Sequence, residues 1–366
     1  MSSNFHSLTV KAIAPETPEA VAVTFDVPDT LKAFFRYTQG QYLTLRFLIN
    51  GKEERRAYSM CSSPLEEGLT VAVKRVKSGI VSNHIADKLK VGDKVDVMPP
   101  EGRFFTKLDA DQKKTYFLIG AGSGITPLFS MLKTILEVEP QSFVYLFYGN
   151  RDEDSIIFKT ALDEIQRKYE GQIEIVYTLS QPKRVKEKGL KGMFSKGSIQ
   201  WSGSVGRLDE GTLNRFLDEH SPRHKSTEYF ICGPGDMIKS AEAILQERGI
   251  AHKNIHAEYF STSPDPNATV VKGKEGAHVI AHLDGSVVEI AVPSGKNILS
   301  ALIDNKYDPP YSCTSGACST CMAKVLKGEV KMEVCYALDE DEVAEGYILS
   351  CQAHPVSDQV EITFEV

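Results

Sequence analysis

Three cysteines stand within a short segment near the C-terminal end of this 366-residue chain, at Cys313, Cys318 and Cys321. The residues between the first two, 314–317, are all small, so the backbone can bend tightly there. A fourth cysteine, Cys351, follows after 29 further residues. A fold that contains this pattern has to bring a tight loop and a distant segment together around one centre.

The spacing Cys-x4-Cys-x2-Cys, with one later cysteine, is the ligand pattern of a plant-type 2Fe-2S cluster. It predicts four thiolate ligands, with backbone N–H groups of the loop directed at the cluster. A zinc site is an alternative, although zinc usually takes paired Cys-x2-Cys units, and buried free thiols are another. Cys335 competes with Cys351 for the fourth position. Cys351 is favoured because it follows an apolar, strand-like run, whereas Cys335 precedes an acidic turn and is expected to be a small buried residue.

Seven cysteines, an odd number, and an N-terminus without the pattern of a secretory signal disfavour a disulfide framework. They predict a reducing, cytoplasmic location. Residues 115–132 form an uncharged stretch of 18 residues, the length at which a membrane-spanning helix has to be considered. The stretch contains glycines, a proline and hydroxyl residues, so we expect a buried strand, a glycine turn and a helix start, and no membrane partner.

The hydrophobic pattern divides the chain into three blocks and predicts a multidomain protein. Residues 1–110 alternate apolar and polar positions with frequent turns, which indicates an antiparallel β-barrel, with a sandwich as the alternative. Residues 111–262 alternate buried strands with helices, which indicates an α/β domain with a parallel sheet. Residues 263–270 are small, polar and proline-bearing, as in a linker, and 271–366 carry the cysteine loop.

Charge is concentrated in the last block. Residues 269–366 contain 7 lysines, no arginine and 15 acidic residues, a formal charge of −8, whereas the whole chain has −7. The densest acidic run is residues 339–345. Such a block repels nucleic acid and attracts a basic protein surface. We therefore expect no nucleic-acid partner and a docking role for the acidic block, with a merely solvated loop as the alternative.

The segment Arg56-Ala57-Tyr58-Ser59 ends the barrel-like block with groups that suit a flavin nucleotide. Arginine can bind a phosphate through two N–H groups, tyrosine can stack on a ring system, and the serine hydroxyl can form a hydrogen bond. Further on, Gly79 and Ser82 stand at the start of a predicted helix, where free N–H groups can bind a pyrophosphate.

A glycine-rich turn, with Gly120, Gly122 and Gly124, follows directly after a buried strand. Glycines there let the backbone approach the pyrophosphate of a dinucleotide. Ile125 replaces the last glycine of the Rossmann G-x-G-x-x-G pattern, which indicates a different dinucleotide family. A later strand ends at Cys232-Gly233-Pro234, the edge at which α/β sheets place their ligands.

Residues that follow two central strands bear on the choice of coenzyme. Arg151 follows one strand, and Ser180 with Lys183 and Arg184 follows the next. Arginine and hydroxyl groups suit a 2′-phosphate, so NADPH is predicted in preference to NADH, although Asp152 stands beside Arg151. The segment 182–206 is a basic insertion, predicted to be a solvated surface, with a phosphate or partner contact as the alternative.

Taken in order, these motifs resemble the ferredoxin–NADP reductase family with an appended plant-type ferredoxin, and the resemblance extends over nearly the whole chain, most closely to reductase subunits of phenylacetyl-CoA epoxidases. It implies a β-grasp fold for the ferredoxin block and FAD, NADPH (or NADH) and a 2Fe-2S cluster as cofactors. It implies that Ser59, Cys232 and Glu258 act at the flavin and nicotinamide. It also implies that Arg56, Tyr58, Ser59, Val73, Gly79, Val81, Ser82, Gly122, Ser123, Gly124, Thr126, Arg151, Ser180, Cys232, Gly233, Pro234 and Phe260 bind cofactors.

A nicotinamide delivers two electrons as a hydride and a 2Fe-2S cluster accepts one, so a flavin has to stand between them. We therefore expect an enzyme that passes electrons from NAD(P)H through FAD and the cluster to an oxygenase component, with phenylacetyl-CoA epoxidase as the acceptor. Reductases of a hybrid-cluster protein or of a steroid or lipid hydroxylase are the alternatives among enzymes. A redox-sensing module is the alternative of another class.

Overall fold

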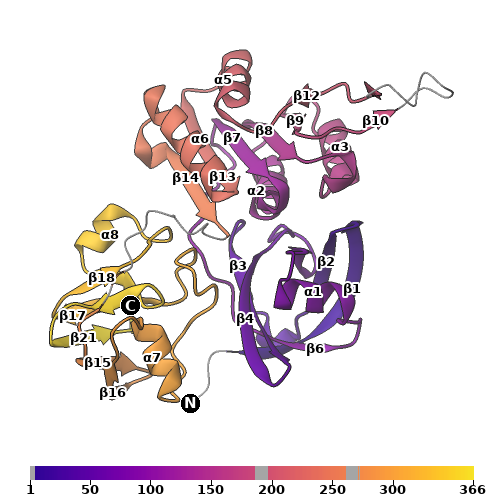
Figure 1. Cartoon of the computed structure of the whole chain (residues 1–366). Helices are drawn as coiled ribbons and strands as arrows, with labels where there is room; N and C mark the ends of the chain where they lie inside the picture. Colours follow the sequence, from indigo (N-terminus) through magenta and orange to yellow (C-terminus); the bar gives the residue numbers. More distant parts are fainter. Residues whose placement is uncertain (1–4, 186–196, 261–270, 272) are drawn as a thin grey trace.

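The computed structural model describes residues 5–185, 197–260, 271 and 273–366. These residues form three domains that follow one another along the chain and meet at a common junction (Figure 1). The predicted linker, 263–270, and residues 186–196 of the basic insertion lie outside the described residues.

The first domain is an antiparallel six-stranded sheet in the order β4-β3-β6-β1-β2-β5. An isolated bridge between Met60, just after β4, and Val71 of β5 joins the two edge strands and closes the barrel. The side chains of alternate strand residues, Leu8, Val23 and Phe25 among them, fill its interior. Its elements are β1 (His6–Thr17), β2 (Ala20–Asp26), β3 (Tyr42–Ile49), β4 (Lys52–Ser59), β5 (Leu69–Lys74), α1 (Ile80–Asp87) and β6 (Lys94–Val97), with a 3-10 turn at Asp29–Leu31.

The second domain is a parallel sheet in the order β12-β9-β8-β7-β13-β14. Helices α2 and α3 contribute to the apolar core on one face of the sheet, and α5 and α6 to the core on the other. The elements are β7 (Lys114–Ala121), α2 (Ile125–Val138), β8 (Phe143–Asn150), α3 (Lys159–Lys168), β9 (Ile173–Leu179), β12 (Ser204–Val205), α5 (Glu210–Glu219), β13 (Ser226–Gly233), α6 (Gly235–Glu247) and β14 (Ile255–Tyr259). Short 3-10 turns occupy Gly122–Gly124, Glu153–Ser155 and His252–Asn254, and a small hairpin pairs β10 (Arg184–Val185) with β11 (Ser198–Ile199).

The uncharged stretch 115–132 therefore consists of β7, a glycine turn and the start of α2, as its composition predicts. Within the described ranges, no helix combines the length and the apolar character that crossing a membrane requires.

The third domain has a five-stranded mixed sheet in the order β16-β15-β21-β17-β19. Its central strands β15 and β21 are parallel and the other pairs are antiparallel, and α7 adds Ile298, Ala301 and Leu302 to the core under the sheet. This is the predicted β-grasp arrangement. The elements are β15 (Ala277–Leu283), β16 (Ser286–Val292), α7 (Ile298–Asp304), β17 (Met322–Lys327), β18 (Val330–Met332), α8 (Glu340–Ala344), β19 (Tyr347–Leu349), β20 (Ala353–Pro355) and β21 (Gln359–Thr363).

Candidate functional site

The loop between α7 and β17 brings three of the predicted cluster ligands to Cys351, the second residue after β19. Cys313 and Cys318 form one hydrogen-bonded thiol pair, and Cys321 and Cys351 form a second. The hydrogen bond within each pair lowers the pKa of the accepting sulfur, Cys313 in one and Cys351 in the other. Cys335 is in neither pair: it is half-buried rather than buried, it packs against the small apolar cluster around Cys321 and Cys351, and its thiol faces the Leu338 carbonyl.

The donor set around this loop fits a two-iron cluster. Among the residues that the structure describes, no three His, Cys, Asp or Glu side chains surround a single ion position. Two pairs of thiols suit two metal atoms with two protein ligands each, whereas a structural zinc site needs four ligands around one point. The backbone N–H of Ser315 and the amide of Gln352 donate to the sulfurs of Cys313 and Cys351, at 3.4 and 3.5 Å.

Three residues from distant parts of the sequence meet where the barrel faces the nicotinamide domain. Ser59, at the end of β4, donates its hydroxyl to Oε2 of Glu258 on β14, at 3.0 Å. Glu258 is paired in register with Cys232 on the neighbouring strand β13. Burial raises the pKa of the Glu258 carboxyl to about 8 and raises the pKa of the Cys232 thiol well above its usual range. At neutral pH this group therefore consists of a protonated acid, a neutral thiol and a hydroxyl.

The residues predicted to bind the flavin nucleotide lie on β4, on β5 and at the start of α1. Arg56 forms an ion pair with Glu54 at 3.1 Å, which a bound phosphate would have to share or displace. Gly79 is the N-cap of α1, and a Cβ there would lie 2.6 Å from the Ser82 hydroxyl, which accepts from the Val76 N–H. Three other residues are predicted to contact the flavin. Tyr58 is half-buried, whereas the side chains of Val73 and Val81 lie in the barrel core. Only the backbone of these two valines could therefore contact a cofactor.

The glycine turn after β7 touches the C-terminal end of β13. A Cβ at Gly124 would lie 2.0 Å from the carbonyl oxygen of Cys232, so only glycine allows this approach. Gly122 has a φ of +56°, and Tyr148 donates to its carbonyl at 2.9 Å. The other predicted residues here are Ser123, which accepts from the Thr126 hydroxyl at 3.0 Å, Gly233, and Pro234, which is the N-cap of α6.

Lys74, which the sequence motifs did not single out, also lies at this turn. Its Nζ is 3.4 Å from the position that a Gly122 Cβ would occupy, and burial together with the charge of Arg151 lowers its pKa. The signal available in the sequence is the strand alternation of β5: Val73 points into the barrel core, so Lys74 must point out of it.

The ends of β8 and β9 place Arg151, Asp152 and Ser180 beside one another. The Ser180 N–H donates to the Asn150 carbonyl at 3.0 Å, which holds the two strand ends together. Asp152 caps the turn Glu153–Ser155 by accepting from the Ser155 N–H at 3.0 Å, and it also pairs with Arg151 at 2.9 Å. Phe260, just after β14, is half-buried against the core on the α2 face of the sheet.

Comparison with known proteins agrees with this geometry. Models of an oxidoreductase FAD-binding domain, an oxidoreductase NAD-binding domain and a 2Fe-2S iron-sulfur cluster binding domain match residues 8–106, 118–243 and 281–356. A subunit of the 1,2-phenylacetyl-CoA epoxidase of Escherichia coli (strain K12) is 37% identical, over 99% of this chain and 98% of that protein. The chain belongs to the ferredoxin–NADP reductase family. It is an NAD(P)H-dependent flavin iron–sulfur oxidoreductase with a C-terminal 2Fe-2S domain.

Two further similarities place this reductase among its relatives. The ferredoxin reductase component of 3-ketosteroid-9-alpha-monooxygenase from Rhodococcus rhodochrous is 35% identical, over 98% of this chain and 96% of that protein. The crystal structure of phthalate dioxygenase reductase has the same three-domain fold, with a TM-score of 0.57, 22% identity and coverage of 98% of both chains.

The ferredoxin domain of the reductase is held against the other two domains by a few polar and aromatic contacts. Arg55 of β4 pairs with Asp308 at 2.6 Å, and the ring of Tyr336 lies 4.5 Å from the ring of Tyr259 at the end of β14. Arg103, just after the barrel, pairs with Glu342 of α8. The acidic run 339–345 is thus not wholly free for a partner, since one of its carboxylates is already neutralised within the chain.

Proposed function

We propose that the reductase passes electrons from NADPH, through FAD and a 2Fe-2S cluster, to the oxygenase component of a phenylacetyl-CoA epoxidase. The proposal rests mainly on one observation. Ser59, Glu258 and Cys232 come together at one place, and the same chain holds two pairs of cysteine thiols in its ferredoxin domain. The 37% identity to a subunit of such an epoxidase supports the choice of acceptor. A steroid monooxygenase is the second candidate, supported by the 35% identity to a ketosteroid monooxygenase component.

The proposed domains are the FAD domain at 1–110, the nicotinamide domain at 111–262 and the ferredoxin domain at 271–366, with 263–270 as the linker. The proposed location of the protein is the cytoplasm. When bound, FAD would take up two electrons as a hydride and release them singly to the cluster. Arg56, Gly79 and the α1 N-terminus would hold its phosphates, and Tyr58 would lie along its ring. Cys313, Cys318, Cys321 and Cys351 would hold the irons.

The chain's own residues divide the remaining tasks. Glu258 holds a proton near neutral pH while its Oε2 accepts from the Ser59 hydroxyl, so the acid can direct its own proton at a reacting ring. The neutral, buried Cys232 fills the space beside them and excludes water. The glycine turn 122–124 and Thr126 present backbone N–H groups to the coenzyme phosphates at the start of α2.

Steady-state reduction of cytochrome c or of ferricyanide by NADPH tests this function directly. A reductase turns over an artificial acceptor continuously, whereas a redox sensor of the alternative class reduces its cluster once and stops. The acceptor is tested next, by measuring how fast the purified epoxidase oxygenase and a steroid hydroxylase reoxidise the reduced cluster. Faster reoxidation by the hydroxylase would contradict the choice of acceptor.

Arg151→Ala should lower kcat/KM for NADPH by about 10- to 100-fold, the effect of one lost charge-assisted hydrogen bond. The wild type should prefer NADPH, because Asp152, the acid that could accept from a ribose hydroxyl, is already engaged with Ser155 and Arg151. Steady-state kinetics with both coenzymes measures the ratio. Arg167→Ala, on the exposed end of α3, is the matched control. A wild-type preference for NADH would refute the proposal.

Electron delivery to the oxygenase should slow as salt rises, because the Debye length falls from about 10 Å at 0.1 M to about 3 Å at 1 M. The acidic run suits this docking, but Asp339 caps α8 and Glu342 pairs with Arg103, so these two are left intact. The variant that tests docking therefore combines Glu340→Gln, Asp341→Asn and Glu345→Gln.

This triple variant should flatten the salt dependence of acceptor reduction in stopped-flow experiments and leave ferricyanide reduction unchanged. The control removes three exposed carboxylates from the nicotinamide domain, by Glu164→Gln, Glu170→Gln and Glu247→Gln. An electron-delivery rate that does not depend on salt in the wild type would end this hypothesis, and the basic segment 183–196 would become the candidate docking surface.

A further inference from the structure

Tyr42 touches both halves of the electron route. It is the first residue of β3, is 5% exposed, and its register partner on β4 is Ser59, the hydroxyl that contacts Glu258. Its own hydroxyl crosses to the ferredoxin domain, where it lies 2.8 Å from Oγ1 of Thr320. Thr320 stands in the loop between Cys318 and Cys321, and these two thiols belong to different pairs. One side chain thus connects the flavin strand with the centre of the cluster loop.

Glu101 fixes the direction of this contact. Thr320 donates its hydroxyl proton to Oε2 of Glu101 at 2.7 Å, so the Tyr42 hydroxyl must be the donor to Thr320. Glu101 and Tyr42 are themselves joined by two backbone hydrogen bonds, of 2.8 and 3.0 Å. The barrel therefore holds two groups in fixed positions around the Thr320 hydroxyl: the Tyr42 hydroxyl, which donates to it, and the Glu101 carboxylate, which accepts from it.

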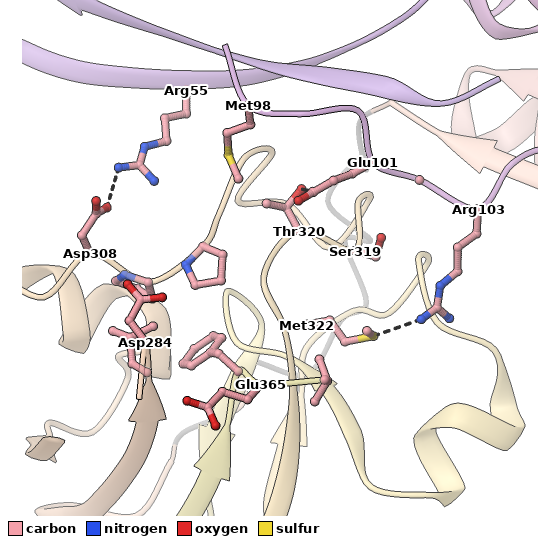
Figure 2. A pocket seen from close by; sticks show the side chains of 16 residues that line it. Arg55, Met98, Glu101, Arg103, Asp284, Asp308, Ser319, Thr320, Met322 and Glu365 are labelled. Carbon is pink, nitrogen blue, oxygen red and sulfur yellow. Dashed lines mark hydrogen bonds and ion pairs between the residues drawn. The ribbon is translucent and has the colours of Figure 1, made fainter. Parts of the chain in front are cut away.

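Other contacts cross the junction around this link, among them those of Arg103 with Met322 and with Glu342. Figure 2 shows Glu101 and Thr320 together, on the wall of a cavity of about 530 Å³ that lies between the barrel and the ferredoxin domain. The same cavity is lined by Arg55 and Asp308, whose ion pair spans the interface at a second point. Because a cavity takes the place of close side-chain packing here, the hydrogen-bonded groups on its wall contribute directly to how closely the cluster loop approaches β3.

We propose that Tyr42, Thr320 and Glu101 are positioning residues that hold the cluster loop at its working distance from the flavin. The step that depends on this distance is the passage of one electron from the reduced flavin to the oxidised cluster. The flavin loses that electron, the cluster gains it, and no covalent bond forms or breaks. The rate of such a transfer falls exponentially with separation, so a small retreat of the loop slows it strongly. The proposal rests on the flavin-to-cluster route proposed above.

Tyr42→Phe removes only the hydroxyl and is the variant that tests the link. In anaerobic stopped-flow mixing with NADPH, flavin bleaching should keep its wild-type rate, whereas reduction of the cluster should slow by about tenfold or more. Hydrogen exchange measured by mass spectrometry should show faster exchange of the amides in residues 313–322. The reduction potential of the cluster, from an EPR-monitored titration, should stay at the wild-type value.

Two conservative substitutions of Thr320 test the same link from the ferredoxin side. Thr320→Val keeps the shape and loses the hydroxyl, so it should reproduce the slow cluster reduction, whereas Thr320→Ser keeps the hydroxyl and should restore the wild-type rate. Tyr145→Phe removes another tyrosine hydroxyl, which donates to the Ser221 carbonyl and accepts from the Arg223 guanidinium, both within the nicotinamide domain. This control should change neither the rate of cluster reduction nor the exchange of the cluster loop.

Three results would overturn the proposal. The first is an unchanged rate of cluster reduction in Tyr42→Phe. The second is an equal slowing of flavin bleaching, which would place the effect at the flavin strand instead. The third is a shift of the cluster potential large enough to account for the slower rate. Reduction of the cluster by NADPH in the wild type tests the proposed electron transfer from flavin to cluster. A failure of that proposal can therefore be told apart from a failure of the positioning role proposed for Tyr42, Thr320 and Glu101.

Discussion

Cys351→Ser abolishes or strongly shifts the visible absorption of the 2Fe-2S cluster and leaves the flavin bands in place, whereas Cys335→Ser leaves both. We expect this result because Cys351 completes the second thiol pair with Cys321, while Cys335 is in neither pair. Absorption spectra and the iron content of the purified variants measure it. Removing one of four ligands leaves one iron with a single protein thiolate, because a serine hydroxyl is a much weaker ligand than a thiolate at neutral pH.

Cys335→Ser is also the matched control, since it makes the same chemical change on the same domain. A bleached cluster in Cys335→Ser, together with an intact one in Cys351→Ser, would reverse the assignment of the fourth ligand.

Glu258→Gln should slow hydride transfer from NADPH to the flavin by about 100-fold at pH 7, the usual size of a lost acid–base contribution. The amide keeps the size of the neutral carboxyl and cannot exchange a proton. Single-turnover bleaching of the flavin under anaerobic conditions measures the rate. In the wild type this rate should fall as the pH rises through about 8, the pKa of the buried carboxyl, and the variant should lose that fall.

Ser59→Ala offers an independent check on the same group. The Ser59 hydroxyl donates to the carboxylate and so lowers the pKa of Glu258, although burial, which raises it, is the larger influence. Without the hydroxyl, the alkaline fall in rate should move to higher pH. A fall that moves to lower pH, or a Glu258→Gln variant with the wild-type rate, would contradict the role given to this carboxyl.

The raised pKa of Glu258 also has a consequence for stability. Below pH 4.5 the carboxyl is protonated in both the folded and the unfolded chain, so it costs nothing there. As the pH rises towards about 8, the unfolded chain ionises and the folded one does not, so the free energy of unfolding falls by about 1.4 kcal/mol per unit of pKa difference. The Glu258→Gln variant should lack this decline when unfolded by urea across the same pH window.

Local patterns carried most of what the sequence predicted correctly. The cysteine spacing predicts a cluster loop because three of its ligands are close neighbours, and the strand and helix periods predict three domains of the observed classes. The glycine turn after β7 is equally local. In each case, residues within about ten positions determine the geometry, so the pattern can be recognised without knowing the fold.

Contacts between domains could not be predicted in this way. Ser59 and Glu258 are 199 residues apart, and Tyr42 and Thr320 are 278 residues apart, so no local spacing connects them. The residue before Arg56 illustrates the difficulty. Arg55 alternates to the opposite side of β4 and pairs with the ferredoxin domain, a role that becomes visible only once the third domain is placed.

The burial of the cluster loop sets an order of events for biogenesis. Cys318, Cys321 and Cys351 are 5%, 1% and 2% exposed once the three domains are together. The ferredoxin domain has its own apolar core, and it leaves the ribosome last, after the barrel and the nicotinamide domain have been made. The residues packed around Cys321 and Cys351, such as Leu299, Leu338 and Leu349, belong to the ferredoxin domain itself. Iron therefore has to be delivered before or while this domain folds. A cell that supplies iron too slowly would accumulate folded ferredoxin domains that lack the cluster, and loading them would require the cluster loop to open.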